Sequence, residues 1–113
     1  MDELTGRARL SVTDRSDGAG LLAAFAGELD IAGLAQVAGP LDDLLARDRQ
    51  PLRLDLSGLH FLDSTGVTVL IRLANRFDPV ESVGATVPVR RVLQVLGLSG
   101  RLGLADPQPG DGT

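Results

Sequence analysis

Hydrophobic and polar residues alternate along four segments of the chain, which is the pattern of β-strands with one buried face. The expected strands are residues 8–13, 21–29, 52–56 and 82–87. A turn-forming cluster at residues 14–20 separates the first two strands, so we expect them to form an antiparallel hairpin. Gly27, inside the second strand, predicts a bulge or a close approach of another backbone. Ser57 and Gly58 are expected to end the third strand.

Three other segments carry apolar residues at helical spacing. The expected helices are residues 31–47, 64–77 and 88–96. Asp30 is a suitable N-cap for the first helix. Pro40 lies in the middle of that helix and has no backbone N–H, so it is expected to kink the helix or to split it in two. Pro88 suits a first helical position, and Gly97 is a natural helix stop.

The predicted order is β-β-α-β-α-β-α, which indicates a single α/β domain. Strands that are joined by helices run parallel, and the hairpin adds one antiparallel edge. We therefore expect a mixed four-stranded sheet with helices packed on it. In such sheets functional residues gather beyond the carboxyl ends of the parallel strands. Asp30, Ser64 and Pro88 each follow a parallel strand, so we expect them to lie at one edge of the sheet.

The length of 113 residues allows one domain with its own core and is too short for two. Residues 1–6 are expected to be a flexible N-terminus and residues 7–104 to form the domain. The last segment, residues 105–113, is rich in Pro, Gly and Asp. We expect it to be a disordered tail.

Composition and charge exclude several classes of partner. Aromatic residues make up 3% of the chain and the formal net charge is −4, which argues against stacking on bases and against binding to a phosphate backbone. The absence of cysteine excludes disulfides and thiolate metal sites. The polar start of the chain and the lack of an apolar run of about 18 residues predict a cytoplasmic protein that does not enter a membrane.

The sequence lacks the common catalytic motifs. It contains no nucleophile elbow, no phosphate-binding loop and no metal-ligand cluster. Asp63 precedes Ser64, but no base is placed to accept the serine proton. His60 is the one histidine and is expected in a loop without a partner. We therefore expect a protein that is not an enzyme and that needs no cofactor or metal of its own.

Three short motifs occur in order along the chain. Gly-Glu-Leu-Asp stands at residues 27–30, Leu-Asp-Leu-Ser-Gly at residues 54–58 leads to Asp-Ser-Thr-Gly at residues 63–66, and residues 89–98 form an apolar helical segment. Together they resemble the STAS domain of bacterial anti-sigma factor antagonists. The matching patterns extend from about residue 10 to residue 104, so the resemblance covers nearly the whole chain.

The resemblance implies a role in partner switching that regulates transcription in a stress response. In that family the serine of the Asp-Ser-(Ser/Thr)-Gly motif is phosphorylated by an anti-sigma factor that is itself a serine kinase, and a serine phosphatase removes the phosphate. By position the phosphoacceptor is Ser64. The residues implied in partner binding are Asp30, Asp63, Ser64, Thr65 and Gly66.

Simpler interpretations remain open for the same residues. Ser64 and Asp63 are both good N-cap residues, and Asp63 is as well suited to orient the serine as to cap the helix. The main alternative function is a STAS scaffold or accessory subunit of a stress-signalling or lipid-transport complex, which binds its partner without a phosphate cycle. A sensor of small ligands is a third reading, which the low aromatic content does not favour.

Overall fold

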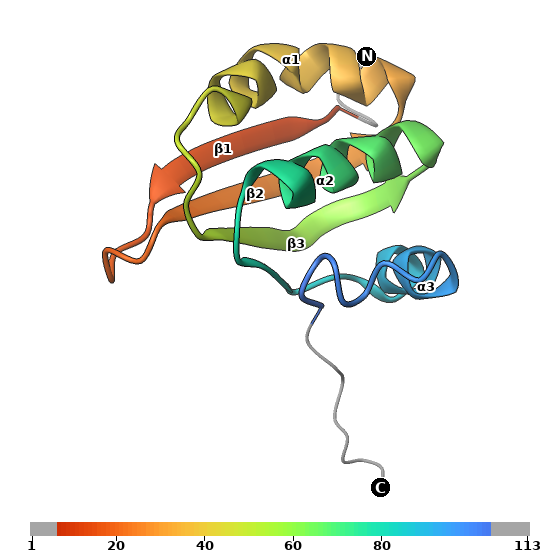
Figure 1. Ribbon diagram of the computed structural model, residues 1–113. Coiled ribbons are helices and arrows are strands. Elements are labelled where there is room, and N and C mark those ends of the chain that lie inside the picture. Colours follow the sequence, from red (N-terminus) through yellow and green to blue (C-terminus); the bar gives the residue numbers. More distant parts are fainter. Residues whose placement is uncertain (1–6, 105–113) are drawn as a thin grey trace, which may run out of the picture.

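The computed structural model describes residues 7–104. Four strands and three helices follow one another in the predicted order (Figure 1). They are β1 Arg9–Asp14, β2 Leu21–Leu29, α1 Ile31–Leu45, β3 Leu52–Leu62, α2 Ser64–Arg76, β4 Val80–Val83 and α3 Val87–Val95. The segments expected to be flexible or disordered, residues 1–6 and 105–113, lie outside the described residues.

The strands form one sheet in the order β1-β2-β3-β4. β1 is antiparallel to β2 across the predicted hairpin. β2, β3 and β4 are parallel, because α1 and α2 carry the chain back so that the next strand runs in the same direction. The expected α/β domain with a mixed four-stranded sheet is therefore confirmed. Gly27 lies at a register shift of β2 with φ of +90°, as its position predicted.

One face of the sheet carries the hydrophobic core. In Figure 1, α1 and α2 lie across this face and α3 lies beside β3. The strand side chains that face the helices are fully or almost fully buried: Leu21, Ala23, Phe25, Leu52, Leu54 and Leu56. Their neighbours in the strands, such as Leu22 and Arg53, face the other side and are only half-buried. This alternation is what a sheet with one covered face requires.

β3 does not end at Ser57 and Gly58, as the sequence predicted, but continues to Leu62. The two residues lie at a bulge instead, because the register against β2 shifts there by one residue. Gly58 suits this place since a Cβ would lie only 3.1 Å from the Cβ of Ala26. The longer strand also includes His60, which was expected in a loop, and leaves its side chain exposed.

The fourth strand is shorter than predicted, and the residue that it buries is a polar one of the alternating pattern. β4 ends at Val83, because Gly84 follows with φ of +72°. The side chain that enters the core is that of Ser82. Its hydroxyl donates a hydrogen bond of 2.7 Å to the carbonyl of Leu102, so the buried polar group is satisfied. The backbone N–H of Ser82 donates to the carbonyl of Gly103. Leu102 is buried in the core, and Leu98 and Leu104 pack half-buried against it.

α1 runs as one helix through Pro40, so of the two predicted effects of the proline, a kink or a split, the split does not occur. The proline is exposed on the outer side of the helix, where its ring displaces none of the core contacts. Val37, Leu41 and Leu44 are buried on the inner side. These contacts before and after the proline hold both halves of α1 against the sheet, although Pro40 donates no backbone hydrogen bond.

Candidate functional site

The carboxyl ends of β2 and β3 lie side by side, which brings the starts of α1 and α2 together (Figure 1). Leu29 and Leu62, the last residues of the two strands, are partners in the parallel register. The backbone N–H of Asp63 donates a hydrogen bond of 3.4 Å to the carbonyl of Leu29. Asp30 and Ser64 therefore lie at one edge of the sheet, as the predicted topology required.

α1 and α2 begin in the same way, with an aspartate that caps the helix and a glycine three residues later. The carboxylate of Asp30 accepts a hydrogen bond of 2.8 Å from the N–H of Gly33. The carboxylate of Asp63 accepts hydrogen bonds from the N–H of Thr65, at 2.8 Å, and of Gly66, at 3.3 Å. Each aspartate satisfies N–H groups that have no partner within the first helical turn, and its charge lies at the positive end of the helix dipole.

The two glycines let both helices start directly against the end of β2. A Cβ on Gly66 would lie 2.4 Å from the carbonyl oxygen of Leu29, and one on Gly33 would lie 2.0 Å from the carbonyl oxygen of Glu28. Gly66 is buried, so it positions α2 and offers little surface to a partner. Sequence reasoning overlooked Gly33, although the Asp-x-x-Gly spacing shared by the two helix starts was a signal that could have found it.

Ser64 is the first residue of α2, and its side chain is exposed. It does not cap the helix, because Asp63 does. The hydroxyl of Thr68, one turn further on, donates a hydrogen bond of 2.9 Å to the carbonyl of Ser64. Thr65 is half-buried and its N–H is bound by Asp63. The sequence thus places an accessible hydroxyl at a helix N-terminus, where the helix dipole favours negative charge.

The start of α3 lies at the same edge. The hydroxyl of Thr86 donates a hydrogen bond of 3.2 Å to the carbonyl of Leu59, near the end of β3. Val87 is the first residue of α3, and Pro88 lies in its first turn, where the missing N–H costs nothing. The surface formed by these three helix starts is called the helix-start edge. It comprises residues 30–33, 63–66 and 86–88.

Residues 12–105 match a family model that is described as Mlab, STAS domain. The chain belongs to the STAS domain family. The match covers most of the chain and includes all three motifs in full. A search of curated protein sequences gave no significant match.

Solved structures share the fold of this STAS domain. An anti-sigma factor antagonist from Mycobacterium paratuberculosis is similar with a TM-score of 0.76 and 21% identity, over 94% of this chain and 91% of that chain. The anti-sigma factor antagonist SpoIIAA in its unphosphorylated form has a TM-score of 0.59 and 20% identity, over 92% and 90%. An uncharacterised protein with a SpoIIAA-like fold from Shewanella loihica has a TM-score of 0.58 and 16% identity, over 98% and 94%.

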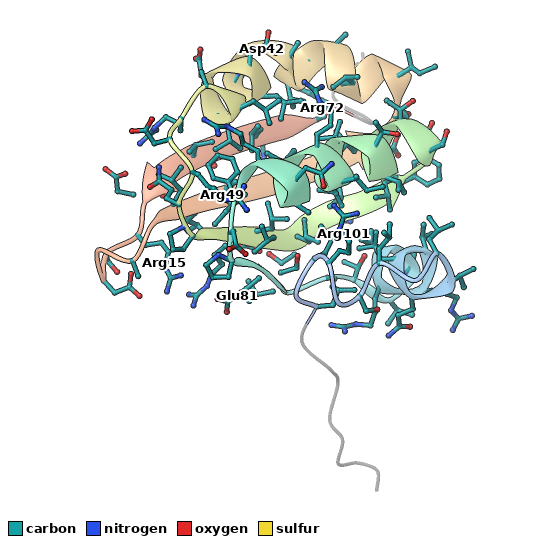
Figure 2. The ribbon with its side chains drawn as sticks, in the orientation of Figure 1. Arg15, Asp42, Arg49, Arg72, Glu81 and Arg101 are labelled. Atoms are coloured by element: carbon teal, nitrogen blue, oxygen red, sulfur yellow. The ribbon has the colours of Figure 1, made fainter. Side chains whose placement is uncertain are left out.

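Basic side chains of the STAS domain gather at the other end of α2 from Ser64. Arg76 donates hydrogen bonds to the carbonyl of Leu45, the last residue of α1, and to that of Arg47 just after it. Arg49 and Arg101 donate hydrogen bonds to Asn75 in the last turn of α2 (Figure 2). These cations lie at the negative end of the helix dipole, which stabilises them. They are about 20 Å from Ser64 along the helix, so they would not neutralise a phosphate on that serine.

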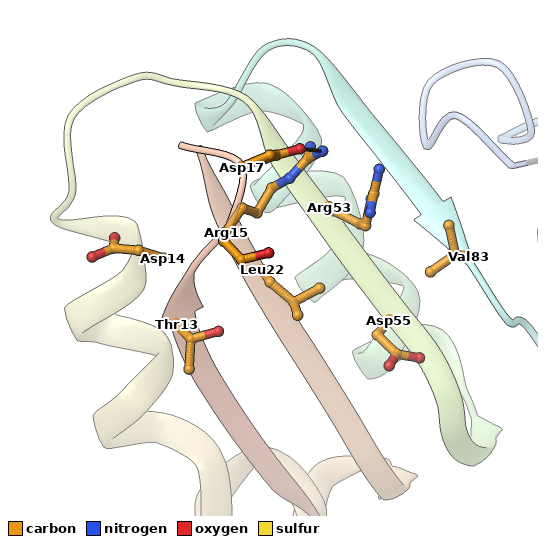
Figure 3. Close-up of a pocket in the computed structure, with 9 residues that line it drawn as sticks. Thr13, Asp14, Arg15, Asp17, Leu22, Arg53, Asp55 and Val83 are labelled. Carbon is orange, nitrogen blue, oxygen red and sulfur yellow. Dashed lines mark hydrogen bonds and ion pairs between the residues drawn. The ribbon is translucent and has the colours of Figure 1, made fainter. Parts of the chain in front are cut away.

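A hollow of about 430 Å³ lies on the open face of the sheet, near the amino ends of the parallel strands (Figure 3). Arg15 pairs there with Asp17 at 2.6 Å, and Arg53 pairs with Glu81 at 3.3 Å. A hydrogen bond from the N–H of Ala19, together with the Arg15 guanidinium, holds the pKa of Asp17 below its usual value. Because both cations are already paired within the chain, we place the functional site at the helix-start edge and not in this hollow.

Within residues 7–104, no helix has the length and apolar character needed to cross a bilayer. In the same range, no three side chains of His, Cys, Asp or Glu come together in a group that could hold a metal ion.

Replacing Asp63 by alanine is expected to lower the free energy of unfolding by about 1 kcal/mol, because two N–H groups at the start of α2 lose their acceptor. Asp63→Asn keeps a side-chain oxygen at the same place and is expected to lose only a small part of that stability. Denaturant unfolding followed by circular dichroism measures both. An equal loss in the two variants would show that the negative charge, and not the cap, is what stabilises α2.

Proposed function

We propose that this STAS domain is an anti-sigma factor antagonist whose binding to its partner is switched off by phosphorylation of Ser64. The observation that carries the proposal is the exposed hydroxyl of Ser64 on the first residue of α2, within an intact Asp-Ser-Thr-Gly motif. Two structural neighbours are named anti-sigma factor antagonists, which supports the same class of function.

The geometry around Ser64 favours a switch that acts at an interface and not through the fold. A phosphoserine adds about −1.5 to −2 charges and three acceptor oxygens. The N-terminus of α2 would favour that charge by about 0.3–1 kcal/mol, whereas the carboxylates of Asp30 and Asp63 would oppose it. These effects nearly cancel, and no core residue has to move. The added charge therefore acts mainly on whatever binds the helix-start edge.

In the proposed cycle the unphosphorylated protein binds an anti-sigma factor that is a serine kinase, and the sigma factor is released. The kinase transfers the γ-phosphoryl group of its ATP to the hydroxyl oxygen of Ser64, and the serine proton leaves with solvent or a kinase base. The complex then dissociates, and a serine phosphatase restores the hydroxyl by hydrolysis. In this scheme the STAS domain acts in the cytoplasm, is not itself an enzyme and uses no cofactor, since ATP belongs to the kinase.

A pull-down from extracts of the source cells tests this proposal. Wild-type protein and the Ser64→Ala variant are expected to capture an ATP-binding anti-sigma kinase, and the Ser64→Ala variant is expected to retain it when ATP is added. Ser64→Glu is expected to capture much less. Failure of wild-type and Ser64→Ala proteins to capture any such kinase would contradict the proposal.

The second candidate is an accessory subunit of a stress-signalling or lipid-transport complex that binds its partner without a phosphate cycle. It is favoured by the description of the matching family model as Mlab, STAS domain, and by the uncharacterised neighbour that shares the fold. Stable capture of a membrane complex, equally by wild-type and Ser64→Glu proteins, would favour this second candidate.

A further inference from the structure

Large apolar side chains that remain exposed are concentrated around the helix-start edge. Among residues 7–104 the exposed ones are Ile31, Phe61, Val87, Val95 and Leu96. Ile31 is the first residue of α1, Val87 is the first residue of α3, and Phe61 is the last but one residue of β3. Their exposed fractions are 76%, 67% and 48%. We call these three residues the apolar trio.

The order of the elements places the apolar trio around Ser64. α1 follows β2, α2 follows β3 and α3 follows β4, so Ile31 lies on one side of the start of α2 and Val87 on the other. Phe61 belongs to the strand that leads into α2, three residues before Ser64. The hydrogen bond from Thr86 to Leu59 ties the start of α3 to the same end of β3. The accessible hydroxyl is thus bordered by apolar groups on three elements.

Nothing in the fold requires apolar residues at these three positions. The first turn of a helix and the end of a strand are places where polar residues are normally stable, and each member of the trio is about half exposed or more. Grouped exposed apolar side chains mark contact surfaces. Asp30 and Asp63, which are half-buried, cap the helix starts at the same edge. A complementary surface is therefore apolar at three points and carries cations or hydrogen-bond donors between them.

We propose that Ile31, Phe61 and Val87 are the anchors by which the unphosphorylated protein holds its kinase partner, a claim that rests on the proposed function. The overall net charge of −4 and the two aspartates favour a partner face with basic groups. The trio also explains how one phosphate reverses binding. Apolar contacts on three sides exclude water from the centre of the interface, and the partner's cations are already paired there with Asp30 and Asp63. A dianion enclosed beside them therefore loses its hydration without a cation left to pair with it.

Two valines on α3 provide a matched test. Val87 and Val95 lie on the same helix with exposed fractions of 67% and 79%, but Val95 is about 12 Å further along the axis. The kinase used as the probe is a recombinant anti-sigma kinase of the source organism that binds the wild-type protein without ATP. We expect Phe61→Ser and Val87→Ser each to weaken its binding about tenfold or more, and Val95→Ser to weaken it less than about twofold. Isothermal titration measures the dissociation constants.

Each outcome of this experiment has a distinct meaning. Thermal melting should be nearly unchanged in all three variants, because the replaced side chains are exposed; a variant that melts much lower is replaced by Phe61→Gln or Val87→Thr. Equal affinities for the wild-type, Phe61→Ser and Val87→Ser proteins would overturn the proposal while the phosphorylation switch stands. If no anti-sigma kinase binds the wild-type protein, the proposed function is wrong, and the proposed role of the apolar trio is wrong with it. Loss of self-association in the variants, with unchanged kinase affinity, would assign the trio to a contact between copies and overturn the proposal.

Discussion

The Ser64→Glu protein is expected to bind the proposed kinase partner about a hundredfold more weakly than wild-type protein and to melt at nearly the same temperature. A hundredfold change in affinity corresponds to only about 2.8 kcal/mol, which a charge enclosed in a closely fitting interface can supply. The fold should tolerate the change because Ser64 is exposed and makes no side-chain contact that α2 needs for its cap. Titration calorimetry and a thermal melt of the same preparation measure the two quantities.

A matched charge elsewhere provides the control for this prediction. Gln94 is exposed on α3, so Gln94→Glu adds one negative charge to the surface without placing it beside Ser64. This variant should bind the kinase nearly as well as wild-type protein. A large fall in the melting temperature of Ser64→Glu would mean that the switch acts by unfolding α2, and the interface account would then be wrong.

Gly66→Ala is expected to be strongly destabilising, with a loss of about 3 kcal/mol in the free energy of unfolding and a melting temperature lower by more than about 10 °C. The new Cβ would lie 2.4 Å from the carbonyl oxygen of Leu29 and 2.8 Å from the Cβ of Leu62. Both atoms belong to the packed ends of β2 and β3, so α2 would have to move away from the sheet. The free energy of unfolding in denaturant and the affinity for the partner should both be lower than in wild-type protein.

Gly39→Ala is the control for this substitution, because Gly39 also lies in a helix but has open space where a Cβ would be. Alanine has the higher helix propensity, whereas Pro40 beside it disfavours a Cβ on the preceding residue in helical conformation. We expect these effects to offset each other to within about 1 kcal/mol. A loss as large as that of Gly66→Ala would show that the close contact at the end of β2 is not the cause of the destabilisation.

The sequence allowed the architecture and the main features of the site to be predicted, because both depend on local signals. Alternation of polar and apolar residues located β1, β2 and the start of β3. The N-cap at Asp30 and the helix stop at Gly97 were also local features, and the structure has both. The alternation of strands and helices required parallel strands, and parallel strands placed Asp30 beside Ser64.

The features that were predicted wrongly depend on contacts between distant segments. The bulge at Ser57 and Gly58 forms because β3 has to pair with β2 along a greater length, which the composition of β3 alone does not reveal. β4 can bury the polar Ser82 because its hydroxyl donates to the carbonyl of Leu102, twenty residues away in the chain. Val83, its apolar neighbour in the strand, is only half-buried.

Incubation of the protein with ATP and the anti-sigma kinase proposed as its partner, followed by intact mass measurement, tests the central claim most directly. The claim is that the exposed hydroxyl at the start of α2 accepts the phosphate. Wild-type protein is expected to gain the mass of one phosphate, which fragmentation assigns to Ser64, and Ser64→Ala is expected to gain none. An unmodified wild-type protein, or a phosphate that remains in the Ser64→Ala variant, would contradict the account.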